Sequence, residues 1–112
     1  MPVSTEISPE TVHRWVGDGE ALLVDVREAN EWAQARLEEA VHVPMSAFDA
    51  DRIPTGTGKK VVFICAQGLR SEQVRQYVVA QGILTDAYNM AGGLKAWAEA
   101  GLPLETEPLS SG

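Results

Sequence analysis

The chain has 112 residues, of which 45% are hydrophobic and 22% charged, which predicts one globular domain and argues against a disordered or fibrous protein. Sixteen acidic against nine basic residues give a formal charge of −7 at pH 7, so nucleic acid and anionic membrane surfaces are not predicted partners. A single cysteine excludes an internal disulfide and a Cys-x-x-Cys zinc or dithiol centre, and no metal or cofactor is predicted.

The start of the chain predicts a cytoplasmic location. Residues 1–6 lack the basic and apolar regions of a signal peptide, and no apolar run approaches the roughly 18 residues of a membrane span. A chain already trimmed of a signal segment would have the same sequence.

The first half of the chain alternates short apolar runs with helical patterns. Its predicted elements are a strand at 5–7, a helix that begins with Ser8 as N-cap and Pro9, a strand at 22–26, a helix at 27–36, a weak strand at 40–43 and a short helix at 45–52. Residues 53–58, rich in glycine, proline and threonine, form the clearest predicted loop.

The second half repeats the alternation. The predicted elements are a strand at 61–64, a helix from after Ser71 to Gln81, a strand at 86–90, a helix carrying Leu94 and Trp97 that ends at Gly101, and a loose tail at 105–112. Strands that alternate with helices predict an α/β fold: a single domain over 1–112, its core at about 5–104, with an open, five-stranded, mostly parallel sheet covered by helices on both faces.

Cys65 ends the apolar strand 61–64 and begins a short loop before a helix. In an open parallel sheet, ligands bind beyond the carboxyl ends of the strands. Amides of residues 66–71 at the helix N-terminus would point at the sulfur, lower the pKa of the thiol and favour the thiolate. Gly68 lets the backbone curl closely, and Arg70 adds a cation. The alternative is a cysteine buried only for packing.

Three segments, in the same order, resemble rhodanese-family sulfurtransferases over about residues 5–104. They are Cys65-Ala66-Gln67-Gly68-Leu69-Arg70-Ser71 as Cys-x-x-Gly-x-Arg-Ser, Asp25-Val26-Arg27 followed by Glu31-Trp32, and Ala91-Gly92-Gly93-Leu94-Lys95-Ala96-Trp97 with Gly101-Leu102-Pro103. In that family a cysteine takes a sulfane sulfur from a donor such as thiosulfate, becomes a persulfide and passes the sulfur to a nucleophilic acceptor.

The resemblance implies a role for each residue of the loop. Cys65 would be the nucleophile and Arg70 the group that holds the sulfonate oxygens of a small anionic donor. The substrate would be bound by Ala66, Gln67, Gly68, Leu69, Arg70 and Ser71. The span of six residues from Cys65 to Arg70 resembles the sulfurtransferases, whereas phosphatases of this fold typically have one residue more.

Asp25 and Arg27 are candidates for supporting the mouth of the site. Their structural interpretation is that Arg27 pairs with Glu31 four residues later, or that Asp25 accepts loop amides. The chain departs from the family at 35–40, where a Gly-His-Ile-Pro-Gly-Ala stretch is common, so the turn into the third strand is predicted to differ.

Two other functions fit the same sequence. One is a persulfide carrier that exchanges sulfur with a protein donor or acceptor and turns over small donors slowly. The other is a non-catalytic binding module that uses only the fold.

Overall fold

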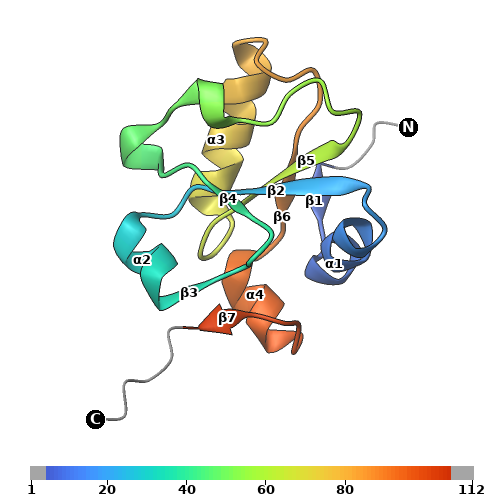
Figure 1. Cartoon of the computed structure of the whole chain (residues 1–112), viewed down its shortest axis with the longest axis vertical. Coiled ribbons are helices and arrows are strands. Elements are labelled where there is room, and N and C mark those ends of the chain that lie inside the picture. Colours follow the sequence, from blue (N-terminus) through green and yellow to red (C-terminus); the bar gives the residue numbers. More distant parts are fainter. Residues whose placement is uncertain (1–4, 107–112) are drawn as a thin grey trace.

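The computed structural model describes residues 5–106, and one five-stranded sheet forms its centre (Figure 1). The strand order is β1-β6-β5-β2-β4, and every neighbouring pair in it is parallel. The elements in chain order are β1 (Glu6–Ile7), α1 (Pro9–Gly17), β2 (Ala21–Asp25), α2 (Ala29–Gln34), β3 (Ala35–Arg36), β4 (Val41–His42), the 3-10 turns η1 (Met45–Ala47) and η2 (Ala50–Arg52), β5 (Lys60–Ile64), α3 (Leu69–Ala80), β6 (Tyr88–Met90), α4 (Gly93–Glu99) and β7 (Glu105–Thr106). The predicted open parallel α/β sheet is confirmed.

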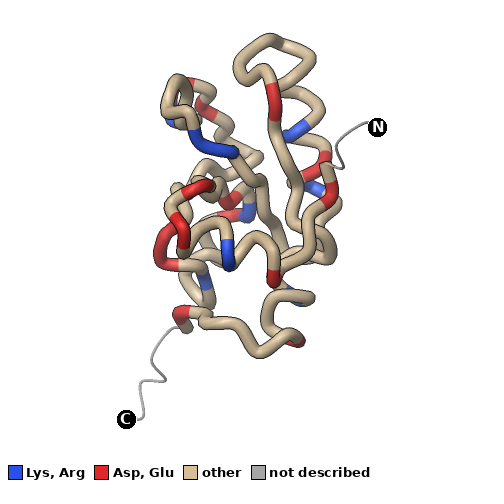
Figure 2. The backbone as a smooth tube through the Cα atoms, turned by 90° about the vertical axis from the view of Figure 1, so that its right-hand side faces the viewer, with Lys and Arg blue, Asp and Glu red and all other residues tan. Residues whose placement is uncertain are grey.

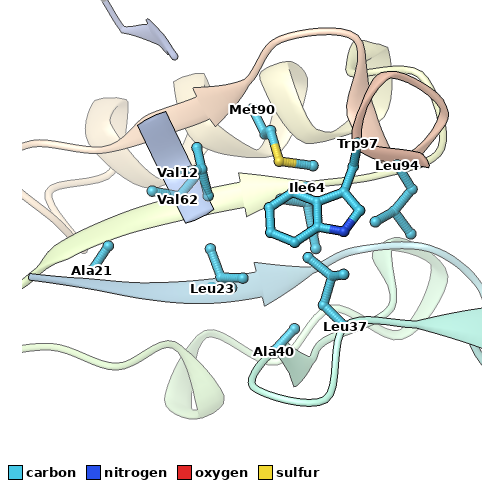
Figure 3. Close-up of a cluster of buried hydrophobic side chains, with 10 residues drawn as sticks. All are labelled: Val12, Ala21, Leu23, Leu37, Ala40, Val62, Ile64, Met90, Leu94 and Trp97. Carbon is cyan, nitrogen blue, oxygen red and sulfur yellow. The ribbon is translucent and has the colours of Figure 1, made fainter. Parts of the chain in front are cut away.

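Both faces of the sheet are buried, as the apolar runs predicted. In β5, Val62 and Ile64 face one core, whereas Val61 and Phe63 face the other. The first core is closed mainly by α1 and α4; Figure 3 shows it with Val12, Ala21, Leu23, Leu37, Ala40, Val62, Ile64, Met90, Leu94 and Trp97. The second core is closed by α3 and by the segment before β5, through Val74, Val78 and Ile53 among others. Because both faces of the sheet are covered, the central strands β2 and β5 are almost unbroken apolar runs.

The register of the sheet places two loops side by side. Asp25, the last residue of β2, pairs with Ile64, the last residue of β5. The segments that follow, beginning with Val26 and Cys65, therefore leave the sheet next to each other at its carboxyl edge.

The first helix begins as the sequence predicts. The Ser8 side chain accepts a hydrogen bond from the amide of Thr11, and Pro9 occupies the first turn. Within residues 5–106, no helix is long and apolar enough to cross a membrane.

The helix predicted at 27–36 is shorter, and this prediction was wrong at both ends. Glu28 is extended at the N-cap and forms a capping box with Glu31, so α2 begins at Ala29. Ala35 is extended, with φ −159° and ψ 141°, and starts β3. Capping and strand pairing both override a weak helical pattern.

The predicted helix at 45–52 is instead two single turns, η1 and η2. Asp49 lies between them in an extended conformation, and its side chain accepts a hydrogen bond from the amide of Asp51. This local bond lets the backbone leave the helical conformation.

The chain beyond 104 is not entirely a tail. Glu105–Thr106 forms β7, which pairs antiparallel with β3 over Ala35 and Arg36. The rest of the predicted tail, 107–112, lies outside the described residues. The pairing uses the segment where the sequence departs from the family pattern.

The Gly92-Gly93 turn lets α4 approach the Cys65 loop. Gly93 has φ +64°, and a Cβ there would lie 2.5 Å from the carbonyl oxygen of Cys65 and 2.6 Å from backbone atoms of Ala66. The amides of Leu94 and Lys95, in the first turn of α4, donate to the carbonyls of Cys65 and Ala66 at 2.9 and 3.0 Å. The turn therefore holds the loop by its backbone.

We expect Gly93→Ala to destabilise the fold by roughly 3 kcal/mol or more, because its Cβ would collide with backbone that no side-chain rotation can move. Gly101→Ala is the matched control: Gly101 has φ +73° but no atom within 4 Å of the added Cβ, so only the conformational strain of about 1–2 kcal/mol remains. Urea unfolding measures both. If both variants lose the same free energy of unfolding, the close approach of Gly93 to the loop contributes nothing to stability.

Candidate active site

Cys65 lies at the carboxyl end of β5, on the floor of an open pocket. Its side chain is 1% exposed, yet it is among the residues that line a cavity of about 380 Å³. The lining residues are Glu31, Cys65, Ala66, Gln67, Leu69 and Arg70. Cys65 is therefore almost fully buried, yet it borders a space large enough for a small molecule.

The backbone of the loop and of the start of α3 turns its donors toward the sulfur. Sγ of Cys65 accepts hydrogen bonds from the amide of Gly68 at 3.1 Å, the amide of Ser71 at 3.4 Å and the hydroxyl of Ser71 at 3.2 Å. Gly68 is the N-cap of α3 with φ 91°, a left-handed conformation that brings these amides together. Of the amides predicted to point at the sulfur, those of Gly68 and Ser71 make hydrogen bonds to it.

These donors favour the thiolate. Burial raises the pKa of the Cys65 thiol, but the hydrogen bonds from the Ser71 hydroxyl and from the amides of Ser71, Gln67 and Gly68 outweigh it, so the pKa is lowered from its usual 9.0. A sulfur surrounded by N–H and O–H donors is stabilised as an anion, and the packing-only interpretation of Cys65 does not account for such a set of donors.

Asn89, a buried residue of β6, positions the donors. Its amide nitrogen donates to the carbonyl of Gly68 at 3.0 Å and to the carboxylate of Glu6 at 3.0 Å, which leaves its oxygen to accept from the Ser71 hydroxyl. A hydroxyl has one hydrogen, so Ser71 donates to Sγ or to Asn89 at any moment. The hydroxyl can therefore donate its hydrogen bond to the thiolate, and donate it to Asn89 instead when the sulfur carries a proton.

The helix α4 orients the first amides of the loop. Because its first turn binds the carbonyls of Cys65 and Ala66, and a trans peptide places C=O and N–H on opposite sides, the amides of Ala66 and Gln67 point away from α4. The Gln67 amide is one of the donors that lower the pKa of Cys65, so this part of the loop adds to a concave, anion-binding backbone.

Arg70 does not point freely into the pocket. Its Nη1 and Nη2 bind the two carboxylate oxygens of Glu31 at 2.7 and 2.9 Å, with the side chains 34% and 31% exposed. The hydrogen bonds from Arg70 lower the pKa of Glu31 from 4.5 to about 2, and the same pair raises the pKa of Arg70. The pair therefore carries both charges throughout the neutral pH range.

Asp25 and Arg27, at the carboxyl end of β2, connect the sheet to the backbone of α2. Both are buried, and the Asp25 carboxylate accepts hydrogen bonds from the Arg27 amide and from its Nε and Nη2. Arg27 also donates to the carbonyls of Glu31 and Ala35, near the end of α2. The predicted pairing of Arg27 with the Glu31 carboxylate was wrong: Arg27 pairs with Asp25 and binds only the backbone of Glu31. The alternative, that Asp25 accepts a hydrogen bond from a loop amide, is what the structure shows, and the amide is that of Arg27.

His42 of β4 adds two further contacts that hold α2 against the sheet. His42 makes a hydrogen bond of 2.7 Å between its Nε2 and the carbonyl of Arg27, and its ring stacks on Trp32 at 4.6 Å between centroids. Glu31 is thereby held at the mouth of the pocket by an element whose ends are both tied to the sheet. Within residues 5–106, no three His, Cys, Asp or Glu side chains form a group that could hold a metal ion.

Of the predicted loop residues, Ala66, Gln67, Leu69 and Arg70 line the pocket with Cys65, while Gly68 and Ser71 contact the sulfur. The site also contains two residues that the sequence did not assign to it: one lines the pocket and one holds the loop. Ser71 and Gly68 touch the sulfur, Leu69 is 72% exposed at the rim, and Arg70 is paired. The missed residues are Glu31 and Asn89. Asn89 had a signal: it is a polar residue within the predicted strand 86–90, and a buried polar group is bonded to something.

Comparisons with known proteins agree with this geometry. The sequence matches the family described as "Rhodanese-like domain" over residues 8–100. It is 29% identical over 102 residues to the thiosulfate sulfurtransferase GlpE of Actinobacillus succinogenes, covering 91% of each chain. It is 35% identical over 100 residues to a sulfurtransferase of Allochromatium vinosum, covering 88% of this chain and 92% of the relative.

Solved structures show the same fold. A rhodanese-related protein from Thermoplasma volcanium superimposes with a TM-score of 0.77 at 25% identity, covering 89% of this chain and 96% of that one. A thiosulfate sulfurtransferase from Pseudomonas aeruginosa also has a TM-score of 0.77, at 28% identity; the match covers 96% of this chain but 21% of that larger one.

We expect Ser71→Ala to raise the pKa of Cys65, because the thiolate loses its hydroxyl donor while the amide donors remain. A hydrogen bond to a charged acceptor contributes about 1.5 kcal/mol or more, so alkylation by iodoacetamide at pH 7 should slow by about tenfold. The rate of alkylation against pH is the measurement. A profile that coincides with the wild type would show that the hydroxyl donates only to Asn89.

The Glu31–Arg70 pair should make stability depend on pH in a defined range. Because the pKa of Glu31 is about 2 in the folded protein and near 4.5 when unfolded, its contribution is fully present above 4.5 and is lost as the pH falls toward 2. Urea unfolding of the wild type and Glu31→Gln should therefore differ most above about pH 5 and converge below it. A difference that is constant from pH 3 to pH 7 would contradict this.

Proposed function

The chain belongs to the rhodanese-like family, and on that premise we propose that it is a sulfurtransferase that carries a sulfane sulfur on Cys65. The observation that carries the proposal is the set of donors that converges on Sγ at the floor of an open pocket. The substrate would be a small anionic sulfur donor such as thiosulfate. A reducing, cytoplasmic setting would keep the thiol free to react.

The first half-reaction loads the cysteine. The thiolate attacks the outer sulfur of thiosulfate, the bond between the two donor sulfurs breaks, and sulfite leaves with the electron pair. The product is the persulfide anion Cys65–S–S⁻. The incoming sulfur occupies the pocket above Sγ, where the amides of Ala66 and Gln67 add to the donors that stabilise the terminal charge.

The second half-reaction returns the thiolate. A nucleophile such as cyanide or a thiolate attacks the terminal sulfur of the persulfide and leaves with it, as thiocyanate or as a new persulfide. The donors that stabilised the starting thiolate now stabilise Sγ as the leaving group. One cradle therefore serves both steps, and no proton transfer is needed.

The test is mass spectrometry of the intact protein. Incubation with thiosulfate should add the mass of one sulfur atom, and cyanide should remove it as thiocyanate. Because Cys65 is the only cysteine, Cys65→Ser should gain nothing while remaining folded. A wild type that stays unmodified with thiosulfate and with other sulfane donors would overturn the proposal.

A persulfide relay between proteins is the second candidate. It is favoured by Leu69, an apolar side chain that is 72% exposed at the rim of the pocket, where a protein partner would contact it. Rapid loading of Cys65 by a cysteine desulfurase, combined with negligible turnover of thiosulfate, would select the relay over the small-molecule reaction.

A further inference from the structure

The mouth of the pocket contains one cation and one anion, bound to each other. Both oxygens of Glu31 are engaged by Arg70, and both residues line the cavity above Cys65. Arg70 and Glu31 are the only ionised side chains among the described lining residues, apart from Cys65 itself. The cation that the resemblance assigns to the donor's oxygens is thus neutralised by its own neighbour.

No other described cation near the pocket offsets this. The guanidinium of Arg27 does not line the pocket and is paired with Asp25, and it is the last of the groups that lower the pKa of Glu31. Lys95 lines a different hollow, beyond Gln67 and next to Gly92. Glu28 adds a further negative charge close to Arg70, and the Cys65 thiolate adds another. Figure 2 shows acidic positions recurring along the described chain, in keeping with a formal charge of −7.

Arg70, although paired, can still donate hydrogen bonds to a bound substrate, but its charge no longer attracts an anion from a distance. Contacts through Nη1 and Nη2 occupy two of the five N–H donors of the guanidinium, so others remain for a substrate oxygen. The attraction of a cation for an anion grows with the charge of the anion, and so does the repulsion from a carboxylate. A carboxylate at this place therefore acts against a dianion more than against a monoanion.

On the basis of the sulfur transfer proposed above, we propose that Glu31 is a specificity-determining residue, which neutralises Arg70 and biases the pocket toward singly charged sulfur donors, such as persulfides and thiosulfonates, over dianionic thiosulfate. Thiosulfate remains a substrate in this view, but it binds without the net positive site that its two charges would favour.

The first test uses reagents that differ in charge and need no sulfur chemistry. Iodoacetate and iodoacetamide both alkylate the thiolate with loss of iodide, but only iodoacetate is an anion. Glu31→Gln keeps an oxygen that can accept the capping-box bond from the Glu28 amide. We expect this variant to raise the ratio of the iodoacetate rate to the iodoacetamide rate by about threefold to tenfold. Any change in the pKa of Cys65 alters both rates equally and cancels in the ratio.

Glu72→Gln is the matched control. Glu72 pairs with Arg75 within α3 at 2.7 Å, so its replacement also removes one negative charge and one Glu–Arg pair, but Glu72 does not line the pocket. We expect its alkylation ratio to stay at the wild-type value. Thermal unfolding confirms that each variant is folded.

The second test compares two sulfur donors. Methanethiosulfonate presents its outer sulfur on a sulfonyl group as thiosulfate does, but carries one negative charge and leaves as methanesulfinate. Glu31→Gln should raise kcat/KM for thiosulfate relative to methanethiosulfonate by about the same factor. An unchanged ratio, a fall in the ratio, or an equal rise in Glu72→Gln would overturn the role of Glu31. If neither donor loads the wild type, the proposed function fails, and the alkylation ratio still decides the effect of Glu31.

Discussion

The site depends on the contact between the start of α4 and the loop that holds Cys65. The amides of Leu94 and Lys95 bind the carbonyls of Cys65 and Ala66, and this is geometrically allowed only because Gly93 has no Cβ. A loop held by its carbonyls has its amides turned to the opposite side, and the amide of Gln67 is one of the donors that lower the pKa of Cys65. Two segments that are far apart in the sequence thus act as one structure, with the final helix fixing the direction of donors that the loop itself contributes.

Two side-chain networks hold the other parts of the site in place, one on β6 and one at the end of β2. Asn89 holds the Gly68 carbonyl and the Ser71 hydroxyl, so that β6 controls the start of α3. Asp25 and Arg27 tie the end of β2 to the backbone of α2, which places Glu31 at the mouth of the pocket. Buried ion pairs of this kind gain little net stability, and their value here is positional. Backbone amides supply most of the hydrogen bonds to the sulfur, so the direction of the backbone decides whether the thiolate is stabilised.

The same geometry separates stabilisation of the sulfur from attraction of the substrate. Donors around Sγ act over hydrogen-bond distances and favour an anion at one place, whatever delivers it. Arg70 and Glu31 act on the approaching molecule through their charges, and together they are close to neutral. In the proposed reaction, the chemistry at the cysteine and the choice of sulfur donor therefore rest on different residues, and the second could change while the first is preserved.

The sequence by itself determined the alternation of strands and helices along the chain and the loop that contains the candidate nucleophile. A short apolar run such as 61–64 between loops is typical of a strand buried on both faces, and a lone cysteine followed by Gly68, Arg70 and Ser71 defines a local motif. It could not determine what depends on contacts between distant segments: the true ends of α2, the pairing of β7 with β3, and Asn89 as a partner of Ser71. From the sequence, Arg70 is a cation next to the cysteine loop. Only the tertiary structure shows that it is paired with Glu31, 39 residues earlier, because α2 packs beside the mouth of the loop.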